Sequence, residues 1–382
     1  MKNKIYYWSP HFVDIATPKA VVNSACSVQK YSDSYDCKVL NFFGEFNKFK
    51  KILNWQNVRL INYFNFDILK YLPKYGKINS RLSLVIMFLI GFFPLKNLIK
   101  KEKPEFMIVH LLTSLPLFLL IFFNFKTKFI LRISGLPKMN YVRTLLWKIA
   151  LKKIFAVTCP TKKTCNYLKS LKIVDPKKIK LLYDPIIDIK KDKKKLFEKN
   201  SFYKDKKNFF LSVGRLTKQK NFLFLCDVFK DYIKANPGAK LIIAGEGEEK
   251  KIIKKFIIDN LLEKNIFLVG YVKNIFPLIK KAKAFILSSL WEDPGFVIIE
   301  AAFCKTLVIS SNCLNGPKEL IKHKHNGILF KSNCKKSLLK ELNNFPRYIK
   351  IKKNIIKNNF KICQNFSTNN HFVKLNLILR GL

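Results

Sequence analysis

The chain has 382 residues, 49% of them hydrophobic, and a formal net charge of +47 at pH 7. This length exceeds what one hydrophobic core usually supports, so we expect two domains of about 150–200 residues each. The positive charge is spread along the whole chain. Only seven residues are Arg, the side chain best suited to bidentate contacts with bases and phosphates. Composition therefore argues against nucleic-acid binding, and the abundant Lys reflects either A/T-rich codon usage or attraction to an anionic membrane surface.

The cysteines and the first residues predict the compartment. Nine cysteines are scattered without a C-x2-C pair, so we expect no zinc site. The chain opens with Lys2-Asn-Lys4 and a strand-like run instead of a secretory signal. Free, mostly buried thiols in a reducing cytoplasm are the expectation.

In the first half of the chain, short apolar runs alternate with helical patterns, which is typical of parallel sheets covered by helices. Strands are predicted at 4–8, 37–42, 106–109, 128–133, 154–158 and 178–182. Helices are predicted at about 17–31, 80–100, 114–123, 140–151 and 160–171.

Two apolar stretches lie within this pattern, Leu82 to Leu95 and Met107 to Phe123. Both are shorter than the ~20 residues that a membrane-spanning helix requires, so we expect core elements. The Lys-flanked segment 82–100 has an alternative as a helix lying in a membrane interface.

The second half repeats the alternation after a Lys- and Asp-rich linker at 186–207. Strands are predicted at 209–213, 240–244, 266–269, 284–288, 306–310 and 327–330, with a helix from about 221. We therefore predict an α/β protein with a first domain at 1–185 and a second at 208–365. The helical tail 366–382 has no obvious partner in the second domain and is expected to pack on the first. In doubly wound domains, ligands bind at the carboxyl ends of the strands.

Two carboxylates bracket a predicted helix start in the sequence Glu292-Asp-Pro-Gly-Phe-Val-Ile-Ile-Glu300. Pro294-Gly295 is a turn signal, and the apolar run from Phe296 predicts a buried helix. A helix start offers free N–H groups and a positive dipole end, which suit a phosphate. The two acids can accept hydrogen bonds from sugar hydroxyls, or else they share no role.

Three other motifs follow predicted strands of the second domain. Gly214-Arg215-Leu-Thr-Lys-Gln-Lys220 places two cations on a glycine-led loop that can clamp a diphosphate. Gly245, in Ala-Gly-Glu-Gly, allows a tight turn or close approach to a ligand. The loop from Asn312 to Glu319 faces either a sugar or phosphate, or simply begins a helix.

In this order and spacing, the motifs between Leu211 and Phe330 resemble the retaining glycosyltransferases of family 4. The resemblance implies the GT-B fold, in which two Rossmann-like domains face a central cleft. It also implies a catalytic group of Arg215 and Lys220 on the donor diphosphate and Glu292 beside the transferred sugar. Donor-binding positions would be Gly214, Gly245, Val272, Gly295, Phe296, Val297 and Glu300, with Glu300 on the ribose and the main chain of Val272 on the base.

The first domain matches the family less well. The family's glycine pair in the acceptor-side loop is replaced by Asp14-Ile15-Ala16-Thr17, and the usual His after strand 128–133 is replaced by Ser134-Gly135. His110 ends another strand, where it either substitutes for that His or is a core residue. His11 has the same two readings, acceptor contact or structure. Thr17, His110, Ser134 and Gly135 are therefore the acceptor-side candidates.

The resemblance implies a hexosyltransferase that moves a sugar, with retention, from a nucleotide diphosphate donor, expected to be UDP-linked. The acceptor is expected to be a lipid-linked or polysaccharide precursor at the inner face of the cytoplasmic membrane, where the enzyme is peripheral. No cofactor and no metal are expected, and no Asp-x-Asp motif is seen near the cleft. The alternatives are a GT-B nucleotide-sugar epimerase and a non-catalytic basic protein that binds nucleic acid or membrane.

Overall fold

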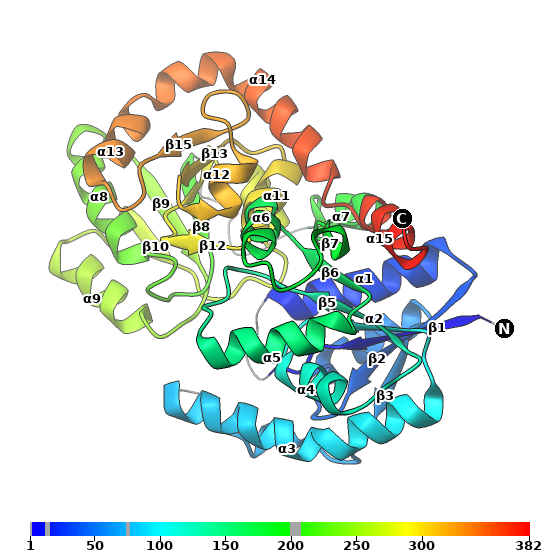
Figure 1. Ribbon diagram of the computed structural model, residues 1–382. Helices are drawn as coiled ribbons and strands as arrows, with labels where there is room; N and C mark the ends of the chain where they lie inside the picture. Colours follow the sequence, from blue (N-terminus) through cyan, green and yellow to red (C-terminus); the bar gives the residue numbers. More distant parts are fainter. Residues whose placement is uncertain (1, 12–15, 74–76, 199–207) are drawn as a thin grey trace. The chain divides into compact units, whose positions relative to one another are not determined.

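The computed structural model describes residues 2–11, 16–73, 77–198 and 208–382. The chain forms two compact units, the first from residues 1–186 and 368–382 and the second from residues 187–367 (Figure 1). Each unit is a parallel sheet covered by helices, so the predicted fold class is confirmed.

The sheet of the first unit has seven parallel strands in the order β3-β2-β1-β4-β5-β6-β7. Their bounds are β1 Asn3–Trp8, β2 Tyr35–Asn41, β3 Arg59–Asn62, β4 Phe106–Val109, β5 Lys128–Arg132, β6 Ala156–Cys159 and β7 Ile179–Leu181. β1 lies between β2 and β4, with Ile5 level with Cys37 and Phe106. The central strands are apolar in continuous runs because helices cover both faces.

Alternate residues of β1 enter different cores of the first unit. Trp8 belongs to a core cluster that includes residues of α3 (Lys77–Glu102), α4 (Ser114–Phe122), α5 (Tyr141–Lys152) and α6 (Lys162–Ser170). Tyr7 belongs to a second cluster that includes residues of α1 (Ala16–Tyr31), α2 (Lys50–Trp55) and α15 (Thr368–Leu379). The last helix, α15, therefore completes a core whose strands come from the beginning of the chain.

The sheet of the second unit has six parallel strands in the order β10-β9-β8-β11-β13-β15. Its strands are β8 Phe209–Val213, β9 Lys240–Ala244, β10 Ile266–Leu268, β11 Ala284–Leu287, β13 Val308–Ser311 and β15 Ile328–Phe330. A small parallel pair, β12 Trp291–Glu292 and β14 Leu314–Asn315, lies outside this sheet. The helices are α7 Ile189–Lys195, α8 Phe222–Ala235, α9 Lys250–Asp259, α10 Phe276–Lys281, α11 Phe296–Phe303, α12 Gly316–Leu320, α13 Lys335–Asn343 and α14 Phe345–Gln364.

Both sheets have the same strand order around their first strand. The second and third strands lie on one side of it and the fourth lies on the other. The side on which successive strands are added to the sheet therefore switches between β1 and β4 in the first unit and between β8 and β11 in the second. Loops that leave these strand pairs at their carboxyl ends diverge, and the space between them is where doubly wound domains bind ligands.

Several elements differ from the sequence prediction. β3 was not predicted, because its four residues alternate weakly between polar and apolar. The segment predicted as a linker contains α7, whose first turn is capped by the Asp188 side chain, which accepts from the N–H of Lys191 at 3.2 Å. The prediction that 82–95 is a core element holds for only one side of α3, since the other side is exposed.

Candidate functional site

The loops that follow β8 and β11 hold the predicted catalytic residues of the second unit. Gly214 and Arg215 directly follow β8, and Ser288 to Glu292 follow β11. β8 and β11 are the two neighbouring strands between which the strand order switches sides. The strand order thus brings together two loops that lie more than 70 residues apart in the sequence.

A buried ion pair joins the two loops. The Nζ of Lys220 pairs with Oε1 of Glu292, and the side chains are 13% and 6% exposed. The hydroxyl of Ser289 donates to the same Oε1 at 2.6 Å. Two donors therefore converge on one carboxylate oxygen and fix the direction of the Glu292 side chain. A buried carboxylate is tolerated because it is paired and hydrogen-bonded.

Arg215 contrasts with Lys220. Its side chain is exposed and forms no hydrogen bond or ion pair with another residue in the described part of the chain. A guanidinium carries five donors in a planar fork, so Arg215 is available to bind an anion. Of the two cations predicted to bind the diphosphate, Lys220 is already paired and Arg215 is open to solvent.

The shape of the Arg215 loop depends on glycine at 245. The N–H of Gly214 donates to Ala244 O at 3.0 Å, and the N–H of Leu216 donates to Glu246 O at 2.9 Å. Gly245 has φ +150°, and a Cβ there would lie 1.8 Å from the carbonyl oxygen of Gly214. Only glycine lets the two loops approach this closely, so Gly245 has a structural role beside Gly214.

The predicted helix start is present at α11. Gly295 is its N-cap with φ +90° and provides no side-chain hydrogen bond. The first N–H groups of the helix, at Phe296 and Val297, have no intrahelical acceptor and point out of its positive end. Glu292 lies in β12 just before this start and Glu300 is buried inside α11, as the spacing predicted.

The loop before α11 is held by its neighbour, the loop before α12. The amide of Asn315 donates to Oδ1 of Asp293 at 2.8 Å. A Cβ on Gly316 would lie 1.7 Å from the carbonyl oxygen of Pro294. The Asn312–Glu319 segment therefore supports the loop that leads into α11, which favours the helix-start reading of that motif.

Val272 lies in the loop that follows β10 and is half-buried. The N–H of Gly245 donates to Gly270 O at 2.8 Å, so this loop borders the Gly245 turn. The second unit therefore brings its predicted donor residues to loops at one edge of its sheet or to α11, where Glu300 lies inside the helix.

The acceptor-side candidates of the first unit are less uniform. Thr17 is half-buried in the first turn of α1. Ser134 is exposed after β5, and Gly135 beside it has φ +73° and accepts from Thr164 Oγ1 at 3.2 Å. Asp14 and Ile15 lie outside the described residues. His11 is buried, with Nδ1 3.0 Å from Ser9 O, and burial lowers the pKa of its imidazole to about 4.

His110 is buried below the carboxyl end of β4. Its imidazole lines a cavity of about 10 Å³ together with Ser24, Arg132, Asp184 and His371. Burial, followed by the nearby charge of Arg132, lowers the pKa of His110 well below its ordinary value. This environment favours the core reading of His110 over a direct contact with substrate.

Sequence reasoning missed the polar residues that position the ion pair. Ser289 binds Glu292, the hydroxyl of Ser288 donates to Lys220 O at 2.8 Å, and the amide of Gln219 donates to Trp291 O at 2.8 Å. The sequence feature that could have indicated these residues is the pair of serines, Ser288 and Ser289, at the end of a predicted strand beside the predicted site. In the described part of the chain, no group of three or more His, Cys, Asp or Glu side chains is arranged to hold a metal ion.

Comparison with known proteins shows the family to which the chain belongs. The family model described as "Glycosyl transferases group 1" matches residues 173–361. An uncharacterized glycosyltransferase of Methanocaldococcus jannaschii is 31% identical over 327 residues, covering 77% of this chain and 73% of the relative. The chain belongs to the group 1 glycosyltransferases.

Two further proteins extend the comparison. A Campylobacter jejuni enzyme is 29% identical over 329 residues, covering 83% of each chain. It is a GalNAc-alpha-(1->4)-GalNAc-alpha-(1->3)-diNAcBac-PP-undecaprenol alpha-1,4-N-acetyl-D-galactosaminyltransferase. The crystal structure of Anabaena HepE in complex with UDP and glucose has a TM-score of 0.74 at 15% identity and covers 100% of both chains. The likeness in structure confirms the predicted GT-B fold.

Proposed function

We propose that this glycosyltransferase moves a hexose from a UDP-sugar to a hydroxyl of a lipid-linked glycan precursor, with retention at the anomeric carbon and without a metal. Arg215, Lys220 and the start of α11 bind the diphosphate. Glu292 binds the transferred sugar, and Glu300 binds the ribose hydroxyls. The single observation that carries the proposal is the Lys220–Glu292 ion pair next to the start of α11, because a cation and an acid then accompany N–H groups that can bind an anion.

The chemistry needs positive charge where the diphosphate leaves. Preorganised donors aimed at developing negative charge are usually the largest contribution to catalysis. An open guanidinium, an ammonium and the free N–H groups of a helix start supply that charge from the protein itself. This supports the proposal that no metal is required.

The proposed acceptor is supported by the substrate of a relative. The Campylobacter jejuni enzyme acts on a glycan that is joined through a diphosphate to the polyprenol undecaprenol. UDP as the donor nucleotide is supported by the HepE structure, which contains UDP. An acceptor of that kind supports the proposal that the enzyme works at a membrane surface, as a peripheral protein on the cytoplasmic side.

The test uses purified protein, EDTA, a panel of UDP-hexoses and UDP-N-acetylhexosamines, and a short-chain polyprenyl diphosphate-linked sugar. We expect acceptor-dependent release of UDP from one donor, and a product whose anomeric proton coupling matches an α-linkage. Glu292→Gln is expected to slow this release by about 10²–10³-fold, whereas Glu263→Gln on an exposed turn of the same unit leaves it intact. Interconversion of donor sugars without an acceptor would instead identify an epimerase, and a β-linked product would exclude retention.

A further inference from the structure

We propose that the exposed side of α3, together with the exposed side of α5, is a docking surface for an anionic lipid bilayer. This surface, the α3–α5 face, belongs entirely to the first unit. It goes beyond the proposed reaction, although it rests on the proposal that the enzyme works at a membrane. Its defining residues are Leu82, Val85, Leu89, Ile90 and Phe93 of α3, Phe122 of α4, and Tyr141, Val142, Leu145 and Ile149 of α5.

α3 is apolar on both of its sides. Met87, Gly91 and Leu95 face the core at a spacing of four residues, and a Cβ on Gly91 would lie 3.1 Å from Leu115 of α4. On the other side, Leu89 and Phe93 are 65% and 63% exposed. A helix at the surface of a water-soluble domain is normally polar on its outer side. The outer side of α3 therefore fits an apolar partner.

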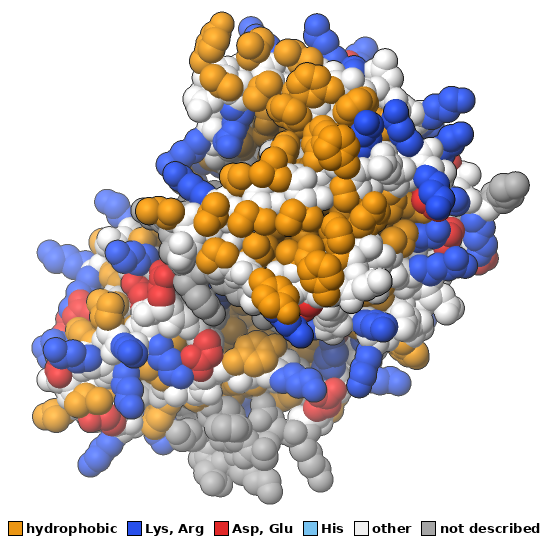
Figure 2. Space-filling view, turned by 90° about the horizontal axis from the view of Figure 1, so that it is seen from below, with side chains coloured by type: hydrophobic (Ala, Val, Ile, Leu, Met, Phe, Trp, Pro, Cys, Tyr) orange, Lys and Arg blue, Asp and Glu red, His pale blue; other side chains and the backbone are white. Residues whose placement is uncertain are grey.

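The patch continues over the neighbouring helices. α4 packs between α3 and α5, and Phe122 at its end is 61% exposed. Val142, Leu145 and Ile149 recur at helical spacing on the exposed side of α5. Figure 2 looks onto α3 and shows hydrophobic side chains merging into one broad patch with Lys and Arg side chains around it. Contiguous apolar patches of this kind mark interaction sites.

Charge decides which partner covers the patch. Lys96 and Lys100 lie at its border, with their Nζ atoms 4.5 and 5.7 Å from the ring centre of Phe123. Such side chains lay their stems on apolar surface and keep the ammonium in water, as at a lipid headgroup layer. Two copies of a chain with net charge +47 repel each other, whereas an anionic bilayer attracts it.

α3 lies on the bilayer and does not cross it. Within the described residues, Ile78–Glu102 is the one helix long and apolar enough to span a membrane, with a mean hydropathy of 2.0. Its core-facing stripe, however, is part of the first unit. Spanning would remove Met87 and Leu95 from a core in which both are fully buried.

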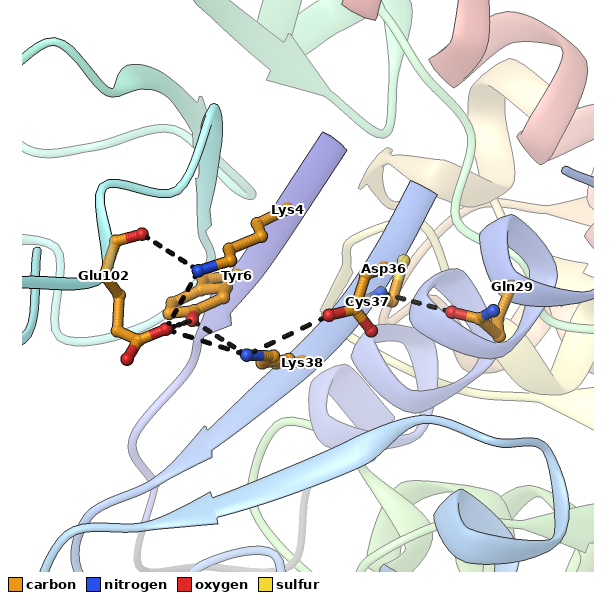
Figure 3. Close-up of polar contacts among 7 residues, drawn as sticks. All are labelled: Lys4, Tyr6, Gln29, Asp36, Cys37, Lys38 and Glu102. Atoms are coloured by element: carbon orange, nitrogen blue, oxygen red, sulfur yellow. Dashed lines mark hydrogen bonds and ion pairs between the residues drawn. The ribbon is translucent and has the colours of Figure 1, made fainter. Parts of the chain in front are cut away.

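The end of α3 is also fixed to the sheet (Figure 3). Oε2 of Glu102 accepts from the hydroxyl of Tyr6 at 2.8 Å and from Nζ of Lys4 at 3.2 Å, and Lys38 lies 3.7 Å away. The hydrogen bond from Tyr6, then that from Lys4, lowers the pKa of Glu102. A carboxylate is unfavourable at the negative end of a helix, so its contribution here is this attachment to β1 and β2.

The position of the face relates it to the acceptor-side residues. α4 and α5 begin after β4 and β5, so their first residues lie near the carboxyl edge of the first sheet. Ser134 and Gly135, which follow β5, are at the same edge. A bilayer on the α3–α5 face therefore presents lipid-linked molecules close to that edge.

The experiment measures binding of the full chain to vesicles by sedimentation. The test variant is L89Q/F93Q/L145Q, and the matched control is I252Q/I258Q/L261Q, which changes three exposed apolar residues of the second unit. Vesicles of phosphatidylcholine with phosphatidylglycerol are compared with phosphatidylcholine alone. We expect the test variant to lose at least about tenfold in partitioning, the control to bind like the wild type, and removal of phosphatidylglycerol or addition of salt to weaken binding.

Three outcomes would overturn the proposal. The first is equal vesicle binding by the test and control variants. The second is equal binding to neutral and anionic vesicles. The third is a wild-type dimer in solution that becomes a monomer in the test variant, which would assign the face to a second copy. Transfer to a short-chain, water-soluble acceptor separates this proposal from the proposed function, because the test variant keeps that activity if only docking is lost.

Discussion

The ammonium of Lys220 and the carboxylate of Glu292 form an ion pair between the loop after β8 and the loop after β11. Neither side chain is more than 13% exposed. Each residue therefore sets the environment of the other, and the two cannot be changed independently.

A double-mutant cycle tests this coupling. Lys220→Met and Glu292→Gln each leave a buried partner without its charge, so we expect each to lower kcat by about 10²–10³-fold and to lower the melting temperature. The double variant K220M/E292Q should be about as slow as the slower single variant and more stable than either. Rate losses that multiply would show that the residues act separately.

Glu300 is predicted to act on donor binding. Glu300→Gln keeps the shape of a side chain that is buried in α11 but removes the charge that strengthens its hydrogen bonds. Affinity for UDP, measured by calorimetry, should fall about tenfold, while kcat at saturating donor stays within a few-fold of the wild type. A loss of kcat with unchanged UDP affinity would contradict the ribose assignment, and Glu263→Gln is the control.

Gly316 is predicted to hold the anion site together. A Cβ at this position would lie 1.7 Å from Pro294 O, so Gly316→Ala must displace the backbone that carries Glu292 and Gly295. We expect lower UDP affinity and a lower melting temperature. Gly238→Ala is the matched control, because its Cβ would meet nothing within 4 Å. Equal behaviour of the two variants would show that the loop tolerates the shift.

His371 is predicted to make the first unit sensitive to acid. Its Nδ1 lies 2.7 Å from Tyr183 O and must carry the proton, so Nε2 accepts from Ser24 Oγ at 2.8 Å. This arrangement requires a neutral ring, and burial lowers the pKa of His371 to about 4 from 6.5. Between pH 6.5 and pH 4 the unfolded state therefore binds a proton at His371 that the folded state does not bind. The contribution of neutral His371 to the free energy of unfolding is fully present above pH 6.5 and falls by about 1.4 kcal/mol per pH unit toward pH 4.

Urea unfolding at pH 7.5 and pH 5 measures this dependence. Tryptophan fluorescence reports mainly on the first unit, which contains the fully buried Trp8. His371→Gln should be less stable at pH 7.5 and should lose less stability on acidification than the wild type. His11 and His110 have lowered pKa values as well, so some acid sensitivity remains. His325→Gln, at an exposed position, should leave the wild-type slope, and an unchanged slope in His371→Gln would refute the prediction.

The strands of the second unit could be predicted because short apolar runs end in glycine, serine or charged residues. The same feature located Arg215, Glu292 and Gly295, since a loop at a strand end must combine tight turns with polar side chains. The contact between Lys220 and Glu292 could not be predicted, because it depends on β8 and β11 being neighbours in the sheet.

The first unit was harder to predict for physical reasons. Apolar residues lie on all sides of α3, and from the sequence alone this pattern fits a core helix and a helix exposed at the surface equally well. His110 follows a strand as a functional residue would, but its burial depends on Arg132, Asp184 and His371 from distant segments. The packing of α15 on α1 likewise reflects tertiary contacts that a local pattern does not contain.

The position of α15 has a consequence for biosynthesis. Leu375 and Leu379 belong to the same core as Ile5 and Val39, although all of residues 187–367 lie between them in the chain. During synthesis on the ribosome, the core of the first unit lacks α15 until the second unit has been translated. Folding of the first unit is therefore completed late, when the last residues of the chain pack on strands near its beginning.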